Sequence, residues 1–522
     1  MTADVGRRVL RATVPVLVLL AVWEVVGRFE LVANGALPAP SAIAAQWWTD
    51  RADYPEHIRA TLTNAAIGFV GGTIVGVLLA LAFSLVPVLE RMFRGVLVTV
   101  FCLPLIVVAP VLAVAFTNPV PSRVLAGLAV VFPMLVSTLV GLQNASASGR
   151  QVVHAAGGGR LASLLYVRLP SARPGIAAGL QIAAPAALLG ALLGEFLGGR
   201  WGLGIYLLGS MSRGIPERIW AIGMTATLIS AAAYGLFGLV GAWAARANAQ
   251  VGSDSGPTPE ALGAVKGPLV KRVGMALLSI AIVLVAWQAF IVIFDLPPTF
   301  ARGPVETFEF LFTAPKASAN REVILDAMAQ TVPLALLGLA VGLLAALVMA
   351  VVATLRPGVA RGLMPICLLL QSMPLVALTP VVVIVLGRDL VTVLAICASV
   401  TFFPAFVTIS QGLASAPPAT LTLMRSVDAS TFTTLWRVRL PTAVPHLLAA
   451  ASLAAPRCIL GVMIAEYLAV GGGLGFLLAE SRGKLSFGMM WAIAAIVVAL
   501  SVAIYRLVAV AEHWAIRRFG PA

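Results

Sequence analysis

The chain has 522 residues, of which 60% are hydrophobic and only 11% are charged. Soluble globular proteins carry about 25% charged residues, so this composition excludes a water-soluble enzyme, and the excess of apolar residues excludes a disordered chain. The formal net charge of +14 therefore indicates basic loops on one side of a membrane rather than a nucleic-acid-binding surface.

Twelve membrane-spanning helices are predicted, because a span needs about 20 predominantly apolar residues. They are expected near residues 10–29, 62–87, 95–116, 123–143, 175–197, 220–243, 273–294, 328–354, 362–386, 390–412, 446–469 and 489–511. The first run follows three arginines and resembles a signal peptide. No small-x-small cleavage site follows it, so an uncleaved span is the favoured interpretation. Runs such as 336–353 do not alternate, which argues against the strands of a membrane barrel.

The distribution of basic residues predicts the orientation. With the N-terminus inside, twelve crossings place 20 of the 35 Lys and Arg residues on the inner side, and the inner segments then carry the whole net charge. Both termini are therefore expected in the cytoplasm, where the basic loops face anionic lipid headgroups and any cytoplasmic partner.

The chain is also a long internal repeat. The segment VRLP at 167–170 recurs at 438–441, VFPMLV at 131–136 recurs as FFPAFV at 402–407, and GEFLGGRWGLG at 194–204 recurs as AEYLAVGGGLG at 465–475. All three pairs are offset by 271 residues. Each copy holds six predicted spans, so both lie the same way up, as a parallel repeat. We expect units at 1–246 and 272–522, joined by a cytoplasmic linker at 247–271.

The longest predicted inner loop of each unit, 151–170 and 422–441, is amphipathic. It is expected to form a short surface helix that ends at the Leu-Pro pair, because proline disfavours continuation of a helix. A solvated connector is the alternative interpretation for either loop alone. Two copies at matched positions favour the docking of a partner.

These loops resemble the EAA loop of ABC importer permeases, which has Glu-Ala-Ala, three residues, Gly, and a later hydrophobic-x-Leu-Pro end. Counting back from the Leu-Pro pairs places 151–153 and 422–424 on Glu-Ala-Ala, and Gly157 and Asp428 on the Gly. Both loops depart from the pattern at its first residue, and the second also lacks the Gly. The Trp-Glu, Pro-Ala-Pro-Ser, Phe-Pro and Glu-Phe-Leu-Gly-Gly segments are most similar to the taurine, alkanesulfonate and nitrate branch.

The resemblance implies a type I importer permease in the bacterial plasma membrane, with two copies of an ABC ATPase, an extracytoplasmic solute-binding protein and a small solute as partners. The favoured solutes are an anion or a heterocyclic vitamin precursor. In such permeases the EAA loop is a coupling helix seated in the ATPase. The residues assigned to coupling are Gln151, His154, Gly157, Arg160, Leu169, Pro170, Thr422, Arg425, Asp428, Leu440 and Pro441.

No catalytic site or cofactor is expected in the chain itself. A P-loop needs Gly-Lys followed by Ser or Thr, and the one Gly-Lys pair, Gly483-Lys484, is followed by leucine. ATP and magnesium are therefore expected in a separate ATPase chain. The four His are scattered and the four Cys lie within apolar runs, so no metal site is expected.

Ionisable groups within spans cost roughly 2.5–3.5 kcal/mol each, which makes Glu195, Glu466 and Arg457 candidate pathway residues. The two glutamates match in the repeat and are either gate groups or carboxylates hydrogen-bonded to the glycine-rich turn that follows. Arg457 matches Ala186 and either meets an anionic solute or, as the favoured interpretation, contacts backbone carbonyls. The remaining pathway candidates are the turn glycines and the Phe-Pro pairs: Gly202, Gly204, Gly473, Gly475, Phe132, Pro133, Phe403 and Pro404. The Phe-Pro pairs either kink their spans beside the pathway or form simple packing kinks, and the sequence leaves both interpretations open.

The alternative function is an ion-coupled secondary transporter of twelve spans in two parallel halves. Such transporters carry a Gly-x-x-x-Asp-Arg-like motif between their second and third spans. This chain has VPVLERMFRG at 86–95 instead, which favours the importer permease.

Overall fold

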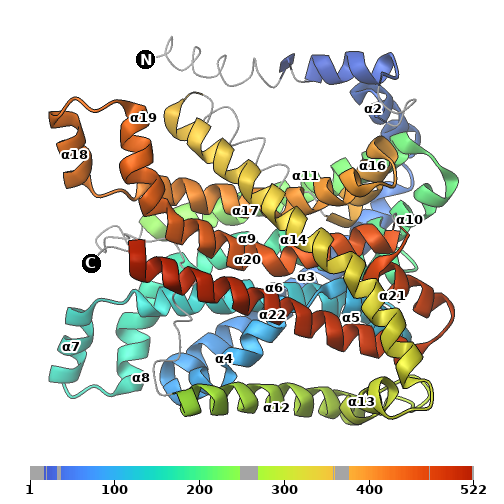
Figure 1. Cartoon of the computed structure of the whole chain (residues 1–522), viewed down its shortest axis with the longest axis horizontal. Coiled ribbons are helices and arrows are strands. Elements are labelled where there is room, and N and C mark those ends of the chain that lie inside the picture. The colour runs from blue at the N-terminus through green and yellow to red at the C-terminus, as the bar shows by residue number, and fades with distance from the viewer. Residues whose placement is uncertain are drawn as a thin grey trace.

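The computed structural model describes residues 17–18, 20–31, 37–246, 269–356, 358, 375–468 and 471–519, and their regular structure is entirely helical (Figure 1). Nine helices in these ranges are long and apolar enough to cross a membrane, and a bent helix pair raises the number to ten. These ten coincide with ten of the twelve predicted spans. The other two, near 10–29 and 362–386, lie partly outside the described residues. The chain is an all-α polytopic membrane protein.

The helices fall into two series, one for each copy of the sequence repeat. In the first unit they are α2 (Pro40–Thr49), α3 (Tyr54–Leu85), α4 (Pro87–Cys102), α5 (Leu105–Ala115), α6 (Val120–Gln143), α7 (Ala147–Ala155), α8 (Arg160–Ser163), the π-helical turn η2 (Leu164–Arg168), α9 (Leu169–Gly198), α10 (Leu203–Arg213) and α11 (Pro216–Arg246). In the second unit they are α12 (Leu269–Ile293), α13 (Pro304–Phe312), α14 (Ala317–Leu355), α16 (Leu375–Leu386), α17 (Leu390–Ala414), α18 (Pro418–Ser426), α19 (Thr431–Thr434), the π-helical turn η4 (Leu435–Arg439), α20 (Leu440–Leu468), α21 (Gly473–Gly483) and α22 (Phe487–Phe519).

The third predicted span is broken rather than continuous. Its two pieces, residues 95–102 of α4 and the whole of α5, meet at an angle of 84°. The break falls at Leu103, which has an extended conformation with ψ 110° and precedes Pro104. Proline disfavours the helical conformation in the residue before it, so the helix stops at Cys102 and restarts in a new direction.

The expectation that the inner loop helix ends at the Leu-Pro pair is wrong. Residues 160–198 and 431–468 each form one long helical span, and Pro170 and Pro441 lie in the first turn of α9 and α20. The π-helical turns η2 and η4 lie directly before the Leu-Pro pairs that contain these prolines. Proline is tolerated in the first turn of a helix. The helical backbone therefore continues from each π-helical turn into α9 or α20.

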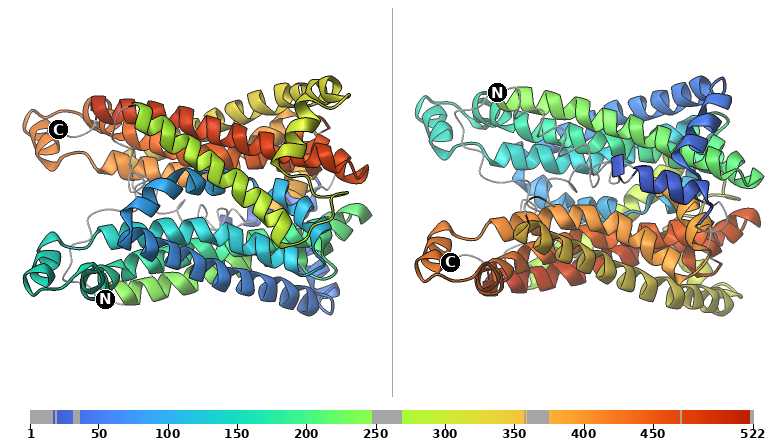
Figure 2. Two further views of the ribbon diagram at one scale, coloured as in Figure 1. Left: turned by 90° about the horizontal axis from the view of Figure 1, so that it is seen from below. Right: turned by 90° about the horizontal axis from the view of Figure 1, so that it is seen from above.

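The two units pack side by side around α9 and α20, which are largely buried. Helix α5 of the first unit contacts α20 and α22 of the second, and α16 of the second unit contacts α9 and α11 of the first. Helices α5 and α16 match in the repeat, and each packs on the other unit. The two units are therefore arranged like the subunits of a two-fold symmetric dimer. Figure 2 shows the units above and below a seam, diverging toward the end that carries α7, α8, α18 and α19.

Helix α12 crosses this seam, as the left view of Figure 2 shows. It packs against α4 of the first unit, where the Ser279 hydroxyl donates to the Met92 carbonyl at 3.3 Å. A Cβ on Gly95 would lie 2.3 Å from the Ser279 Oγ, so the two helices touch through their small residues. Nearer its other end, Trp287 stacks on Trp491 of α22 at a ring-centroid distance of 5.5 Å. Helix α12 thus contacts both units.

A leucine in the turn before α22 holds a conformation that suits glycine. Leu485 has φ +53° and is 65% exposed, whereas the matched residue of the first unit is Gly214 with φ +64°. The left-handed conformation costs a leucine roughly 1–2 kcal/mol. We expect Leu485→Gly to raise the free energy of unfolding by about 1 kcal/mol, seen as a higher thermal unfolding midpoint of the purified chain.

Gly214→Ala is the matched control for this substitution. A Cβ on Gly214 would meet no atom within 4 Å, so the backbone conformation alone decides the effect. We expect this variant to melt at a lower temperature than the unmodified chain. A lower melting temperature for Leu485→Gly would contradict the prediction.

Candidate functional site

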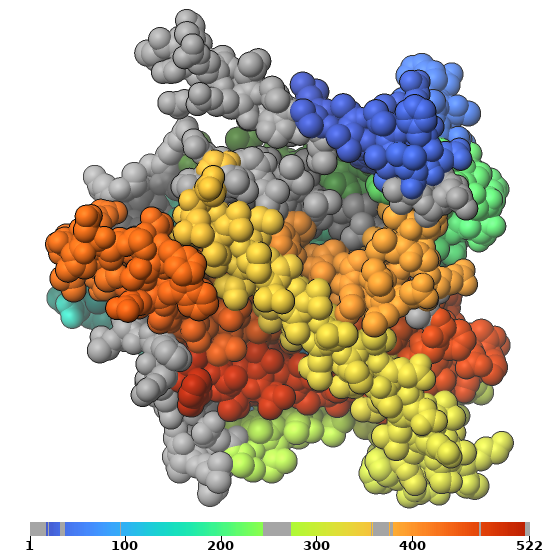
Figure 3. All heavy atoms as spheres, turned by 45° about the horizontal axis from the view of Figure 1, so that its top comes forward, coloured from blue at the N-terminus to red at the C-terminus, as the bar shows by residue number. Residues whose placement is uncertain are grey.

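Two helical loops project from one end of the molecule, which we call the loop end. They are formed by α7, α8 and η2 in the first unit and by α18, α19 and η4 in the second, and Figure 1 labels their α-helices. Figure 3 shows α18 and α19 standing out from the body of the protein. The glycine-rich turns that follow α9 and α20 lie at the opposite end, the turn end.

The two loops share one turn geometry although their sequences differ. Gly157 has φ +79° and the matched Asp428 has φ +54°. In both loops the next residue closes the turn, since the amides of Gly158 and Ala429 donate to Val153 and Met424 at 2.8 Å and 2.9 Å. Aspartate is one of the few residues other than glycine that visits the left-handed region, so the second loop keeps the bend of the first without its glycine.

The exposed apolar residues of the loops occur at matched positions. The pairs Val152 and Leu423, Leu161 and Phe432, and Leu165 and Trp436 are each offset by 271 residues, and every member is at least half exposed. Six large apolar side chains projecting from the ends of two loops form a surface typical of a protein interface. In the second loop, Phe432 and Trp436 contact each other edge to face, so its surface is more aromatic.

The other residues assigned to coupling divide into two groups. Those of the loop helices are exposed: Gln151, His154, Gly157, Arg160, Thr422, Arg425 and Asp428. The Leu-Pro pairs are half-buried where the loops join α9 and α20: Leu169, Pro170, Leu440 and Pro441. The structure thus places the first group, and not the second, on the projecting surface.

In the first unit, Glu195 is buried near the turn end of α9. Its carboxylate accepts hydrogen bonds from the Thr61 hydroxyl at 2.7 Å, the Asn64 amide at 3.1 Å and the backbone amide of Gly204 at 3.2 Å. The Thr61 oxygen in turn accepts from the amide of Leu203 at 2.8 Å. The carboxylate therefore joins α3 and α9 to the turn that begins α10.

The second unit repeats this arrangement around Glu466. Its carboxylate accepts from the Thr331 hydroxyl at 2.8 Å and 2.9 Å and from the Gly475 amide at 2.9 Å, and Thr331 accepts from the Leu474 amide. Sequence reasoning missed the two threonines. Their signal was present, since Thr61 and Thr331 are offset by 270 residues. A gating role for the glutamates remains a prediction.

The turn glycines have little room for a side chain. A Cβ on Gly202 would lie 2.2 Å from the Glu195 carboxylate, and a Cβ on Gly473 would lie 2.1 Å from that of Glu466. Both residues have positive φ, +132° and +79°. The glycine-rich turn is therefore built around the buried carboxylate.

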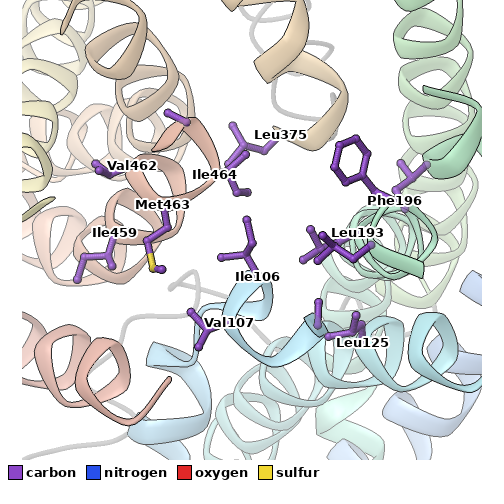
Figure 4. Packing of buried hydrophobic residues seen from close by; sticks show 14 of the residues in the cluster. Ile106, Val107, Leu125, Leu193, Phe196, Leu375, Ile459, Val462, Met463 and Ile464 are labelled. Atoms are coloured by element: carbon purple, nitrogen blue, oxygen red, sulfur yellow. The ribbon is translucent and has the colours of Figure 1, made fainter. Parts of the chain in front are cut away.

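Buried apolar side chains close the seam between the units. Figure 4 shows Leu193 of α9 and Ile464 of α20 pointing toward each other's unit, with Ile106 of α5 and Leu375 of α16 near Ile464. All four belong to one buried cluster that runs through both units. Sequence reasoning missed this closure because apolar residues in a span carry no signal of which neighbour they face.

The remaining candidates do not gather at one place. Phe132 stacks on Phe101 of α4, which also contacts Tyr505 of the second unit, so it lies close to the seam. Phe403 packs edge to face on Phe402 within its own helix. Pro133 and Pro404 lie inside α6 and α17. Arg457 is an exposed residue of α20 and has no contact with Glu466 among the hydrogen bonds and ion pairs of the described residues.

Two apolar helical units in tandem, each with a projecting loop at the same end, define a polytopic transport permease. The family model described as "Binding-protein-dependent transport system inner membrane component" matches the chain twice, over residues 72–250 and 338–517. The matches cover more than half of the chain, which belongs to this family of ABC transporter permeases.

The similar proteins each match less than half of this chain. A "Probable ABC transporter permease protein" of Haemophilus influenzae is 28% identical over 228 residues, 44% of this chain and 93% of that protein. The formylaminopyrimidine transport permease ThiX of Halalkalibacterium halodurans is 30% identical over 38% of this chain and 79% of its own length. The putative aliphatic sulfonates permease SsuC of Bacillus subtilis is 24% identical over 39% of this chain and 75% of its own length.

Proposed function

We propose that this chain forms the whole translocation pathway of an ATP-driven importer, along the seam between its two fused units. Two copies of a separate ABC ATPase dock at the loop end, one on α7–α8 and one on α18–α19. The ATPases hold the ATP and magnesium. A solute-binding protein delivers solute at the turn end, and the loop end and both termini face the cytoplasm of a bacterial inner membrane. The units are residues 1–246 and 272–522, with 247–271 as linker.

The observation that carries this proposal is the matched exposure of apolar residues on the two loops. A connector needs no apolar surface, and one exposed leucine needs no explanation. Three matched pairs on two projecting loops fit two copies of one partner. Each side chain that the partner buries contributes about 1.5–3 kcal/mol, which is enough for stable docking.

The differences between the loops predict unequal docking. Aromatic residues such as tryptophan dominate interface energies more often than leucine does. We therefore expect Trp436→Ala to weaken ATPase binding about tenfold, and the matched Leu165→Ala to weaken it about threefold. The measurement is the amount of ATPase that co-purifies with each variant, together with the ATP hydrolysis rate of the complex.

Leu485→Ala at the turn end is the matched control, because it also removes an exposed apolar side chain. It is expected to leave ATPase binding unchanged. The proposal fails if Trp436→Ala and Leu165→Ala both keep full ATPase binding, or if the chain alone moves solute in liposomes driven by an ion gradient.

A further inference from the structure

One face of α20 is left free by the other helices of its own unit. The Cys458 thiol donates to the Ala335 carbonyl of α14, Gly461 packs against α17, and Ser452 bonds Glu512 of α22. The face between these contacts holds Leu453, Arg457, Leu460 and Ile464, since residues spaced by three and four share a side of a helix. Because α20 contacts α4 and α5 of the first unit, this face is directed toward the first unit.

Helix α9 has the same free face at positions offset by 271 residues, which are Ile182, Ala186, Leu189 and Leu193. We call the two sets the seam stripes. Both stripes are accessible toward the loop end and closed toward the turn end: Ile182 is 43% exposed, whereas Leu193 and Ile464 are buried. The buried side chains that Figure 4 labels therefore mark the turn-end limit of both stripes.

Arg457 is the one charged residue of the seam stripes. It is exposed although the residues around it, 454–456 and 458–459, are buried, so its side chain points away from the packed side of α20. Within the described part of the chain it has no hydrogen bond, ion pair or ring contact. Ile464 lies seven residues, or about 10 Å, closer to the turn end on the same face.

An arginine without a partner inside a membrane protein is costly. Among the described residues, no hydrogen bond or ion pair joins this arginine to a carboxylate or a carbonyl, whereas the buried glutamates Glu195 and Glu466 each accept from several donors. A guanidinium presents a planar fork of donors that suits an oxyanion with two acceptor oxygens. The rest of the stripes is aliphatic and suits an apolar body.

We propose that Arg457 is a solute contact of the translocation pathway and that it binds small oxyanions with an apolar body, just on the loop-end side of the apolar closure. The inference rests on the proposed function, because it takes the seam as the pathway. The contact is one-sided, since the matched residue of the first unit is Ala186.

The test is the labelling of a cysteine placed beside Arg457, in the full chain reconstituted in nanodiscs. Leu453→Cys lies one turn away on the same face, with its Cβ about 5–6 Å from that of Arg457. The probes are 2-sulfonatoethyl methanethiosulfonate, an anion, and 2-(trimethylammonio)ethyl methanethiosulfonate, a cation. The unmodified chain gives the background, to which the buried Cys102, Cys397 and Cys458 contribute little.

We expect Arg457→Gln to lower the ratio of the anionic to the cationic labelling rate at Leu453→Cys about fivefold, and Arg457→Lys to preserve most of the ratio. Sodium ethanesulfonate should slow labelling in the chain with Arg457 and not in the Gln variant. Trp201→Cys, exposed at the turn end, is the control site and should keep its ratio in all variants. An unchanged ratio at Leu453→Cys, or no effect of ethanesulfonate, would overturn the proposal.

Ile182→Cys on the first stripe separates this inference from the proposed function. If Ile182→Cys and Leu453→Cys are both inert to both probes, the seam is not a pathway and both proposals fall. If both cysteines react, and the ratio of the anionic to the cationic labelling rate does not change when Arg457 is replaced, only the proposed anion contact is disproved. The labelling needs no ATPase, so weak ATPase docking does not affect it.

Discussion

Gly204→Ala is expected to abolish recovery of the folded chain. A Cβ at this position would lie 2.3 Å from the backbone carbonyl oxygen of Leu192 and 2.8 Å from the Glu195 Cβ. A backbone atom within a buried helix cannot move aside, so α10 would have to separate from α9. Overpacking of this kind costs about 3 kcal/mol or more. The yield of monodisperse protein and its thermal unfolding midpoint report the effect.

Gly209, in the same short helix, provides the control for this substitution. A Cβ on Gly209 would meet nothing within 4 Å, and alanine is favoured over glycine within a helix by roughly 0.5–1 kcal/mol. We expect Gly209→Ala to melt slightly higher than the unmodified chain, and Gly475→Ala to fail like Gly204→Ala, because its Cβ would lie 2.3 Å from the Met463 carbonyl oxygen. Normal yield and stability of Gly204→Ala would show that this packing is wrong.

A second large loss of stability is expected when the buried carboxylate of the first unit is removed. Glu195→Ala leaves the Thr61 hydroxyl, the Asn64 amide and the Gly204 amide without their acceptor. Each unsatisfied buried donor costs about 1–3 kcal/mol, and the lost side chain leaves a void. We expect the free energy of unfolding to fall by about 3 kcal/mol or more, measured by thermal unfolding in detergent.

Isosteric variants test whether the hydrogen bonds cause this loss. In Glu195→Gln the amide oxygen can keep the bonds from Thr61 and Gly204, which reach the same carboxylate oxygen, and only the Asn64 bond is lost. We expect about 1 kcal/mol of destabilisation. In the described part of the chain Glu466 has no counterpart of the Asn64 bond, so Glu466→Gln should cost less than Glu195→Gln. Equal losses for Gln and Ala at position 195 would argue against the hydrogen-bonding account.

Most of the fold could be predicted from the sequence, because hydrophobic length and the 271-residue repeat are strong signals. The predicted spans at 123–143 and 390–412 differ from α6 and α17 by only a few residues. Pro104 and Pro170 show the limit of this reasoning. Both follow a leucine, yet the helix breaks before Pro104 and continues past Pro170, because the second proline follows a π-helical turn that no composition rule reveals.

The candidate site was predictable only where residues match across the repeat. The loops, the glutamates and the turn glycines stand at matched positions, and the structure finds each pair in matched surroundings. The acceptor role of Glu195 toward Thr61 required the packing of α3 on α9, which joins residues 134 apart in the chain. Equally, the sequence placed Arg457 in a span, but only the burial of its neighbours reveals which way it faces.

The position of α12 changes what can move when the pathway opens. Close to its middle the helix contacts α4 of the first unit through Ser279 and Gly95, and at Trp287 it contacts α22 of the second. A helix fixed in this way acts as a brace across the seam. If the units rock apart at the loop end, either the Ser279 contact breaks or α12 stays with the first unit and swings about its tryptophan pair. In the second case the bodies that move are not the two halves of the repeat, and the pivot lies beside Trp287 and Trp491.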